Sequence, residues 1–223
     1  QYILTSESEE TGQAFITVDE AGQNTILVYG GANMTLSATD VEMSVDAFIG
    51  ADFVVAQLEV PFEAIEQAFK IARKQNITTV LNPAPAIELP KSLLELTDII
   101  IPNETEAELL TGISINNESD MKETATYFLD LGISAVLITL GEQGTYCAYQ
   151  EQYKMIPACN VKAIDTTAAG DTFIGAFLSE LNKDLSNLES AIRLANQASS
   201  LTVQRKGAQA SIPTRKEVEA EYN

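Results

Sequence analysis

Short apolar runs that alternate with amphipathic helical segments constrain the fold of this chain more than any other feature. From residue 39 onward the pattern predicts helices at 39–48, 61–75, 90–96, 104–111 and 118–131, and strands at 53–58, 77–81, 98–101 and 135–139. Apolar, β-branched strands of this kind are buried in a parallel sheet that helices cover on both faces. The sequence therefore predicts an α/β fold with a mostly parallel sheet.

The two ends of the chain show a different pattern. Residues 13–18 and 25–29 predict a hairpin around a turn at 19–24, and residues 145–149 and 153–156 predict an antiparallel pair at the sheet edge; helices are expected at 170–182, at 187–203 and from Pro213. The segment Gly30-Gly31-Ala32-Asn33 is typical of a turn that ends a strand. One main domain, 1–223, accounts for all these segments.

Polar residues stand where several of the predicted strands end. Glu59, Asn82, Asn103 and the segment 139–141 each follow an apolar run. Each one alone reads as a capping or turn residue. Because ligands bind at the carboxyl ends of the strands in parallel sheets, the four positions together favour a site at one edge.

The stretch from Asp165 to Phe173 predicts a tight loop that enters a helix. Small residues at 168–170 precede apolar residues at helical spacing. The first amides of a helix lack partners within it, so a loop without bulky side chains lets a phosphate approach the backbone. Asp171 would then accept the proton of an attacking hydroxyl. The alternative is that Asp165 or Asp171 only caps the helix.

Composition excludes several other functions. The net charge of -19 argues against binding a nucleic-acid backbone, and the absence of histidine leaves carboxylates as the acid–base groups. Cys147 and Cys159 form no metal or redox motif, so we expect free thiols in a reducing cytoplasm. No apolar run reaches about 18 residues and no signal peptide is evident, which predicts a soluble, cytoplasmic protein.

The segment 165–173, Asp-Thr-Thr-Ala-Ala-Gly-Asp-Thr-Phe, resembles the C-terminal signature of the ribokinase branch of the phosphofructokinase B sugar kinases. Segments 81–86, 102–108, 139–141 and 205–213 resemble other parts of these kinases, in the same order. The resemblance implies a ribokinase-like three-layer fold with remnants of a small β lid or edge strands at about 1–29. It also implies ATP-dependent phosphorylation of D-ribose to D-ribose 5-phosphate.

The resemblance implies a role for each site residue. Asp171 would be the general base, and the backbone of Ala168, Ala169 and Gly170 would receive the phosphoryl group. The remaining roles are nucleotide binding (Asn103, Thr139, Gly141, Asn196), sugar binding (Glu59, with Asp171), water-mediated Mg²⁺ binding (Glu106) and monovalent-cation (K⁺) binding (Asp165, Thr167, Thr202, Arg205, Gly207, Ser211). From the residues alone, Glu106 reads as a first-turn glutamate, Asn196 as an exposed helical residue and 204–209 as a helix end.

The sequence departs from the family pattern at its start. Residues 30–33 lack the lysine and one glycine of the family's Gly-Gly-Lys-Gly-Ala-Asn motif, and we expect that the chain lacks the N-terminal third of such a kinase. Alternatives are therefore another sugar or nucleoside kinase of the superfamily, or a non-catalytic nucleotide-binding remnant. A dinucleotide-binding oxidoreductase is disfavoured because no Gly-x-Gly-x-x-Gly follows a strand. Family members commonly pair through lid strands, which implies a homodimer.

Overall fold

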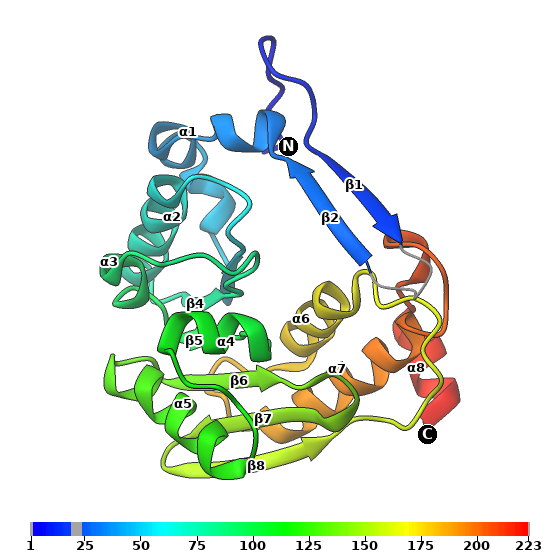
Figure 1. The fold of residues 1–223 in the computed structure, drawn as a ribbon. Coiled ribbons are helices and arrows are strands. Elements are labelled where there is room, and N and C mark those ends of the chain that lie inside the picture. Colours follow the sequence, from blue (N-terminus) through cyan, green and yellow to red (C-terminus); the bar gives the residue numbers. More distant parts are fainter. Residues whose placement is uncertain (1, 19–23, 223) are drawn as a thin grey trace. The chain divides into compact units, whose positions relative to one another are not determined.

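The structure, a computed structural model, describes residues 2–18 and 24–222 (Figure 1). It divides into two compact units, Gln1–Thr97 and Asp98–Asn223. The single-domain prediction stays a prediction, and most of the turn expected at 19–24 lies outside the described residues.

The first unit begins with an antiparallel hairpin, as predicted. Strands β1 (Gln13–Val18) and β2 (Asn24–Tyr29) pair with Gln13 opposite Tyr29. The expected turn that follows is a 3-10 helix, η1 (Gly31–Thr35). Gly31 is buried with φ +51°, and a Cβ there would lie 2.3 Å from the Glu10 carbonyl oxygen, so this close approach requires glycine.

The rest of the first unit is α/β. Its elements are α1 (Ala38–Met43), the 3-10 helix η2 (Val45–Phe48), β3 (Phe53–Ala56), α2 (Phe62–Lys74), β4 (Thr78–Leu81) and α3 (Lys91–Leu94). Strands β3 and β4 are parallel. The helix predicted at 39–48 is two helices, because the backbone leaves the α conformation at Ser44 and Phe48 packs with Ile71 and Ile77 in the core. Strand β3 ends at Ala56, whereas the sequence predicted a strand that continues to residue 58.

The second unit contains four strands in the order β5, β6, β7, β8: Ile99–Ile100, Ala135–Thr139, Gly144–Tyr149 and Gln152–Pro157. The pair β5–β6 is parallel, while β6–β7 and β7–β8 are antiparallel. The predicted antiparallel edge is confirmed. Gly144 has φ +110°, and a Cβ there would meet the Ile156 carbonyl oxygen at 2.2 Å, so β7 can begin this close to β8 only with glycine.

The helices of the second unit are α4 (Glu104–Thr111), α5 (Glu118–Asp130), α6 (Ala169–Glu180), α7 (Leu188–Thr202) and α8 (Arg215–Tyr222), with short 3-10 helices at Gly141–Gln143 and Gln209–Ser211. α6 and α7 pack side by side (Figure 1). Two hydrogen bonds join them near the start of α6: Ser199 to the Ala169 carbonyl at 3.0 Å, and Thr202 to Thr172 at 3.0 Å.

Helices cover both faces of the sheet in the second unit. Because side chains alternate along a strand, Tyr146 and Thr145 of β7 point to opposite faces. Thr145 bonds to Asn196 of α7 at 3.0 Å. Tyr146 lies on the same face as Tyr153 of β8, and the Tyr153 hydroxyl is 3.3 Å from Thr126 of α5. α5 and α7 therefore sandwich the strands, which confirms the predicted arrangement of layers for this unit.

Among the described residues, no helix combines the length and the apolar character that a membrane crossing requires.

Candidate active site

The first turn of α6 follows a residue in an unusual conformation. Ala168, the residue that precedes the helix, has φ +61° and ψ +13°, which is the left-handed region. No described side chain caps this helix start. The Ala169 N–H donates to the Thr166 carbonyl at 3.2 Å, and the first i to i−4 bond runs from Thr172 to Ala168 at 2.9 Å. The first turn is thus built from small residues and left without a side-chain cap.

The space outside this helix start is open. Gly170 is exposed, and a Cβ built on it would meet no described atom within 4 Å. Its amide belongs to the first turn, where N–H groups have no partner within the helix and carry the positive end of the helix dipole. Asp171 follows it and is also exposed. The predicted base is therefore accessible rather than buried in the core.

Asp165 fixes the turn that leads into α6. Its Oδ1 accepts a hydrogen bond from the Thr167 N–H and its Oδ2 accepts one from the Gly207 N–H, both at 3.0 Å. These bonds, with Gly207 contributing most, lower the pKa of Asp165 to about 2 because they favour the charged form. The carboxylate thus joins the turn before α6 to the loop after α7. Asp165 does not cap α6, because no described side chain accepts from the first amides of this helix.

The segment after α7 meets the Asp165 loop, as the resemblance implied. The Ile164 and Asp165 N–H groups donate to the Val203 carbonyl at 2.7 and 3.1 Å. Thr202 and Ser211 are buried. The Thr202 hydroxyl donates to Thr172 of α6 at 3.0 Å, and the Ser211 hydroxyl donates to the Ala208 carbonyl at 2.6 Å. Among the six expected cation-site residues, Asp165 bonds to Thr167 and to Gly207, and the Arg205 N–H donates to the Thr202 carbonyl at 3.0 Å.

Asn103 and Glu106 form a capping box at the start of α4. The Glu106 N–H donates to Asn103 Oδ1, while Glu106 accepts from the Asn103 N–H and from Nδ2, all at 2.8 Å. Asn103 also forms a parallel bridge with Thr139, whose N–H donates to the Pro102 carbonyl at 2.9 Å. Two of the expected nucleotide-binding positions therefore lie side by side at strand ends.

Glu106 is a buried carboxylate, only 6% exposed. Burial raises its pKa, and the hydrogen bond from the Asn103 backbone only partly offsets this effect. The described residues contain no cluster of three or more His, Cys, Asp or Glu side chains that could hold a metal ion. Mg²⁺ needs no such cluster, because it keeps several waters and binds through one or two carboxylates together with substrate phosphates. A single desolvated carboxylate is consistent with that mode.

The remaining predicted residues differ in their surroundings. Asn196, assigned to nucleotide binding by the resemblance and read from the residues alone as an exposed helical residue, is 7% exposed: its Nδ2 donates to the Ile156 and Pro157 carbonyls at 3.2 and 3.1 Å, and its Oδ1 accepts from Thr145. Its amide thus ties α7 to the two edge strands. Gly141 is exposed with φ +54° just after β6. Glu59 is exposed after β3 in the first unit.

Sequence reasoning missed Glu217, which the structure connects to this region. Its carboxylate caps α8 at Thr214 and pairs with Arg205 at 2.7 Å. The spacing Thr214-x-x-Glu217 is a capping-box signal that could have identified the cap. The pairing with Arg205 has no sequence signal, because it depends on how the loop before α8 folds.

The chain combines alternating strands and helices with an uncapped, glycine-containing helix start that follows the Asp165 turn. The family model for the pfkB family of carbohydrate kinases matches residues 1–215. The chain belongs to this family, and the predicted fold class is confirmed.

Individual relatives are ribokinases. The chain is 64% identical over 217 residues to the ribokinase of Staphylococcus aureus strain COL, covering 97% of this chain and 71% of that protein. It is 44% identical to the ribokinase of Haemophilus influenzae, covering 97% and 70%. Among solved structures, the ribokinase of Arabidopsis thaliana complexed with ribose and ATP is 33% identical with a TM-score of 0.85, covering 96% and 69%. The crystal structure of Sa239 is 63% identical with a TM-score of 0.87, covering 98% and 72%.

Proposed function

We propose that this protein catalyses ATP-dependent phosphorylation of D-ribose to D-ribose 5-phosphate. The single observation that carries the proposal is the start of α6, where an exposed Asp171 directly follows the open, uncapped amide of Gly170. The relatives support the substrates, because several are named ribokinase and one was solved with ribose and ATP.

Asp171 acts on the acceptor in this reaction. Its carboxylate accepts the proton of the ribose 5-hydroxyl as that oxygen attacks the γ-phosphorus of ATP and the bond to the β-phosphate oxygen breaks. ADP leaves with the electron pair of the broken bond. Because the base is on the first turn of the helix, the same element positions the proton acceptor and the phosphate-binding amides.

The helix start holds the phosphoryl group as it moves. The resemblance assigned this role to the backbone of Ala168, Ala169 and Gly170. Because the Ala169 N–H already donates to Thr166, we assign the main contact to the Gly170 N–H, supported by the helix dipole. Donors that are fixed in place before the reaction stabilise developing charge without reorganising.

Two kinds of cation complete the proposal. Mg²⁺, when bound, neutralises charge on the nucleotide phosphates, and Glu106 would hold it through water at the start of α4. K⁺ would be held by oxygen atoms around Asp165, Thr167, Thr202, Arg205, Gly207 and Ser211. Backbone carbonyl and side-chain oxygens of the segments 165–167 and 202–211 would be the ligands, because a hard cation prefers oxygen. Asn103, Thr139 and Gly141 would line the nucleotide, and Glu59 the sugar. Pairing of two copies through β1 and β2 stays a prediction.

Replacement of the base tests the proposal. We expect Asp171→Asn to lower ribose-dependent ADP release by about 10²-fold to 10⁴-fold, the usual contribution of a general base, while ATP binding stays unchanged. Asp184→Asn is a matched control, because Asp184 is an exposed aspartate of the loop between α6 and α7. Wild-type turnover in Asp171→Asn would remove Asp171 from the role of base.

A second sugar is the main competing function. The deoxyribokinase of Salmonella typhi is 34% identical over 96% of this chain, so 2-deoxyribose is the first alternative acceptor to test. A comparison of kcat/KM for ribose, 2-deoxyribose and a nucleoside decides between them. Nucleotide binding without turnover on any of these acceptors would favour the non-catalytic alternative.

A further inference from the structure

One ion pair connects helix α8 to the loop that follows α7. Arg205 Nη2 lies 2.7 Å from Glu217 Oε1, and the two side chains are 36% and 44% exposed. The other oxygen of the same carboxylate, Oε2, accepts from the N–H and the hydroxyl of Thr214, both at 2.8 Å. Glu217 is therefore held by its own helix start in a fixed position, and Arg205 pairs with an immobilised acceptor rather than with a freely rotating one.

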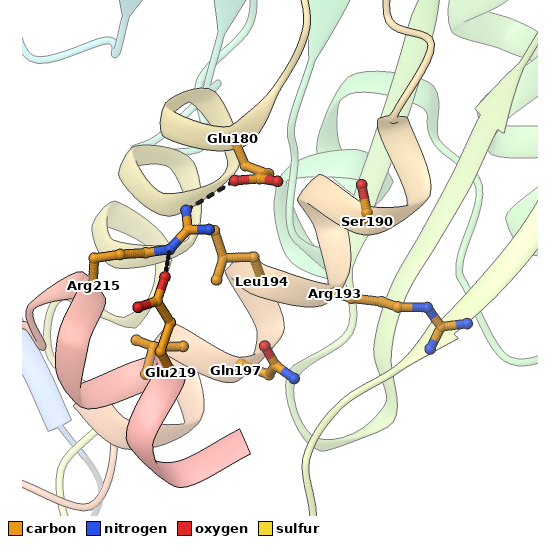
Figure 2. Close-up of a pocket in the computed structure, with 8 residues that line it drawn as sticks. Glu180, Ser190, Arg193, Leu194, Gln197, Arg215 and Glu219 are labelled. Atoms are coloured by element: carbon orange, nitrogen blue, oxygen red, sulfur yellow. Dashed lines mark hydrogen bonds and ion pairs between the residues drawn. The ribbon is translucent and has the colours of Figure 1, made fainter. Parts of the chain in front are cut away.

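Helix α8 is itself anchored to α6 and α7. Arg215 lies between Glu180 at the end of α6 and Glu219 of α8, with both nitrogen–oxygen distances at 2.8 Å, and lines a hollow of about 160 Å³ (Figure 2). The Tyr222 hydroxyl is 2.6 Å from Ser200 Oγ, and Val218 is buried with apolar residues of α7. These contacts along the length of α8 make it a rigid base for the ion pair.

Two residues after Arg205, the loop that follows α7 contacts the turn that leads into α6. The Gly207 N–H donates to Asp165 Oδ2, and the other oxygen of Asp165 accepts from the Thr167 N–H. Gly207 has φ +94°, a conformation that other residues rarely adopt, so the loop must be held in one specific shape for this bond to form. The contacts form a continuous chain from Glu217 through Arg205 and Gly207 to Asp165.

We propose that Glu217 is a positioning residue for the kinase reaction: through Arg205 it holds Gly207 against Asp165 and so fixes the turn at which α6 and Asp171 begin. The inference rests on the proposed function for its catalytic consequence. Glu217 needs no contact with substrate, because it acts only on the loop. Loss of the ion pair would free the loop, weaken the bond between Gly207 and Asp165, and leave the base less well placed.

Three substitutions separate positioning from helix capping. Glu217→Gln and Arg205→Gln each break the ion pair, from the helix side and from the loop side. Thr214→Ala removes the hydroxyl of the α8 cap but keeps the pair. Glu219→Gln is the matched control, because it removes another ion pair of α8 at 2.8 Å that has no connection to the loop.

The first readout is amide hydrogen exchange at Gly207 in the whole chain. We expect both pair-breaking substitutions to accelerate exchange by about threefold, within the range of a partly exposed ion pair, and the double variant to add little further. We also expect kcat to fall while the KM for ATP stays constant, because the base moves and the nucleotide side does not. Thr214→Ala keeps the Thr214 N–H bond to Glu217 and the ion pair, so it should accelerate exchange less than the two pair-breaking substitutions. Glu219→Gln should leave both readouts unchanged.

The outcomes distinguish this inference from the proposed function. Unchanged Gly207 exchange in Glu217→Gln and Arg205→Gln would overturn the inference even if kcat fell. Equal acceleration in Thr214→Ala would also overturn it, because the effect would then come from fraying of α8. A wild-type chain without ribose phosphorylation would contradict the proposed function, while the exchange experiment would still decide whether Glu217 holds the loop.

Discussion

The helices α4 and α6 lie in the same unit but differ at their N-termini: side chains bond to the first amides of α4, and no described side chain bonds to those of α6. At α4, Asn103 and Glu106 fill the site with three hydrogen bonds of 2.8 Å. At α6, the corresponding position is Ala168 and no described side chain caps the helix. Both sequences place an acidic residue in the third helical position, Glu106 and Asp171, yet one carboxylate is buried and the other is exposed.

The difference shows what makes a helix start suitable for a phosphate. The dipole and the unpaired amides are common to every helix, so they cannot by themselves select an anion site. A side chain that reaches back over the first turn occupies the positions an anion would take. Small residues leave those positions open, at the cost of a less stable helix start.

Filling the open start should have the largest effect. Gly170→Val places a side chain where no described atom lies within 4 Å, so folding should be preserved. The side chain would keep phosphate from the amide, and we expect kcat to fall about a hundredfold, the usual effect of losing one such donor. Thr105→Val is the matched control at the same helical position of α4 and should leave kcat unchanged. Normal turnover in Gly170→Val would show that phosphate does not approach this amide.

Removing the cap of α4 should affect stability more than any single change at the start of α6. Asn103→Ala removes the acceptor for the Glu106 N–H and one donor to its buried carboxylate. We expect the free energy of unfolding to fall by about 1 to 2 kcal/mol in urea titrations. Ser37→Ala, at the exposed capping box of α1, is the comparison for an ordinary cap. If Asn103→Ala lowered the free energy of unfolding no more than Ser37→Ala does, the bonds from Asn103 to the buried Glu106 carboxylate would add no stability beyond that of an ordinary cap.

Relief of backbone strain at the start of α6 should have a smaller and opposite effect. Ala168 has φ +61°, which costs an alanine about 1 to 2 kcal/mol, and glycine avoids this cost but loses more entropy on folding. We expect Ala168→Gly to raise the free energy of unfolding by about 0.5 kcal/mol, the difference between these terms. Ala169→Gly, inside the helix, should lower it. Destabilisation by Ala168→Gly would indicate that the alanine methyl group makes a stabilising contact.

Acidification should separate the capping carboxylates by pKa. Burial raises the pKa of Glu106 above 4.5, whereas hydrogen bonds from Thr214 and the pair with Arg205 lower the pKa of Glu217 to about 2. Glu106 therefore stabilises the fold fully only below pH 4.5 and loses this contribution as the pH rises through its raised pKa. Glu217 stabilises the fold above pH 4.5 and loses this contribution as the pH falls toward 2. Carboxyl carbon shifts, assigned with Glu106→Gln and Glu217→Gln, should show Glu106 protonating first. Protonation in the reverse order would contradict the burial of Glu106.

Much of this comparison was visible in the sequence. The alternation of strands and helices predicted the fold because period and apolar content are local properties, and the segment 165–173 marked the start of α6 through its lack of bulk. The break at Ser44 and the burial of Asn196 were not predicted, because tertiary packing decides both. The pairing of Arg205 with Glu217 depends on the path of a loop, for which the sequence carries no periodic signal.

The most direct test is a crystal structure of the protein with ADP, aluminium fluoride and D-ribose, a mimic of the phosphoryl group in transfer. We expect the fluoride group about 3 Å from the Gly170 amide, and the ribose 5-hydroxyl within hydrogen-bond distance of the Asp171 carboxylate. A fluoride group bound away from the start of α6, or an Asp171 side chain turned away from the sugar, would contradict it.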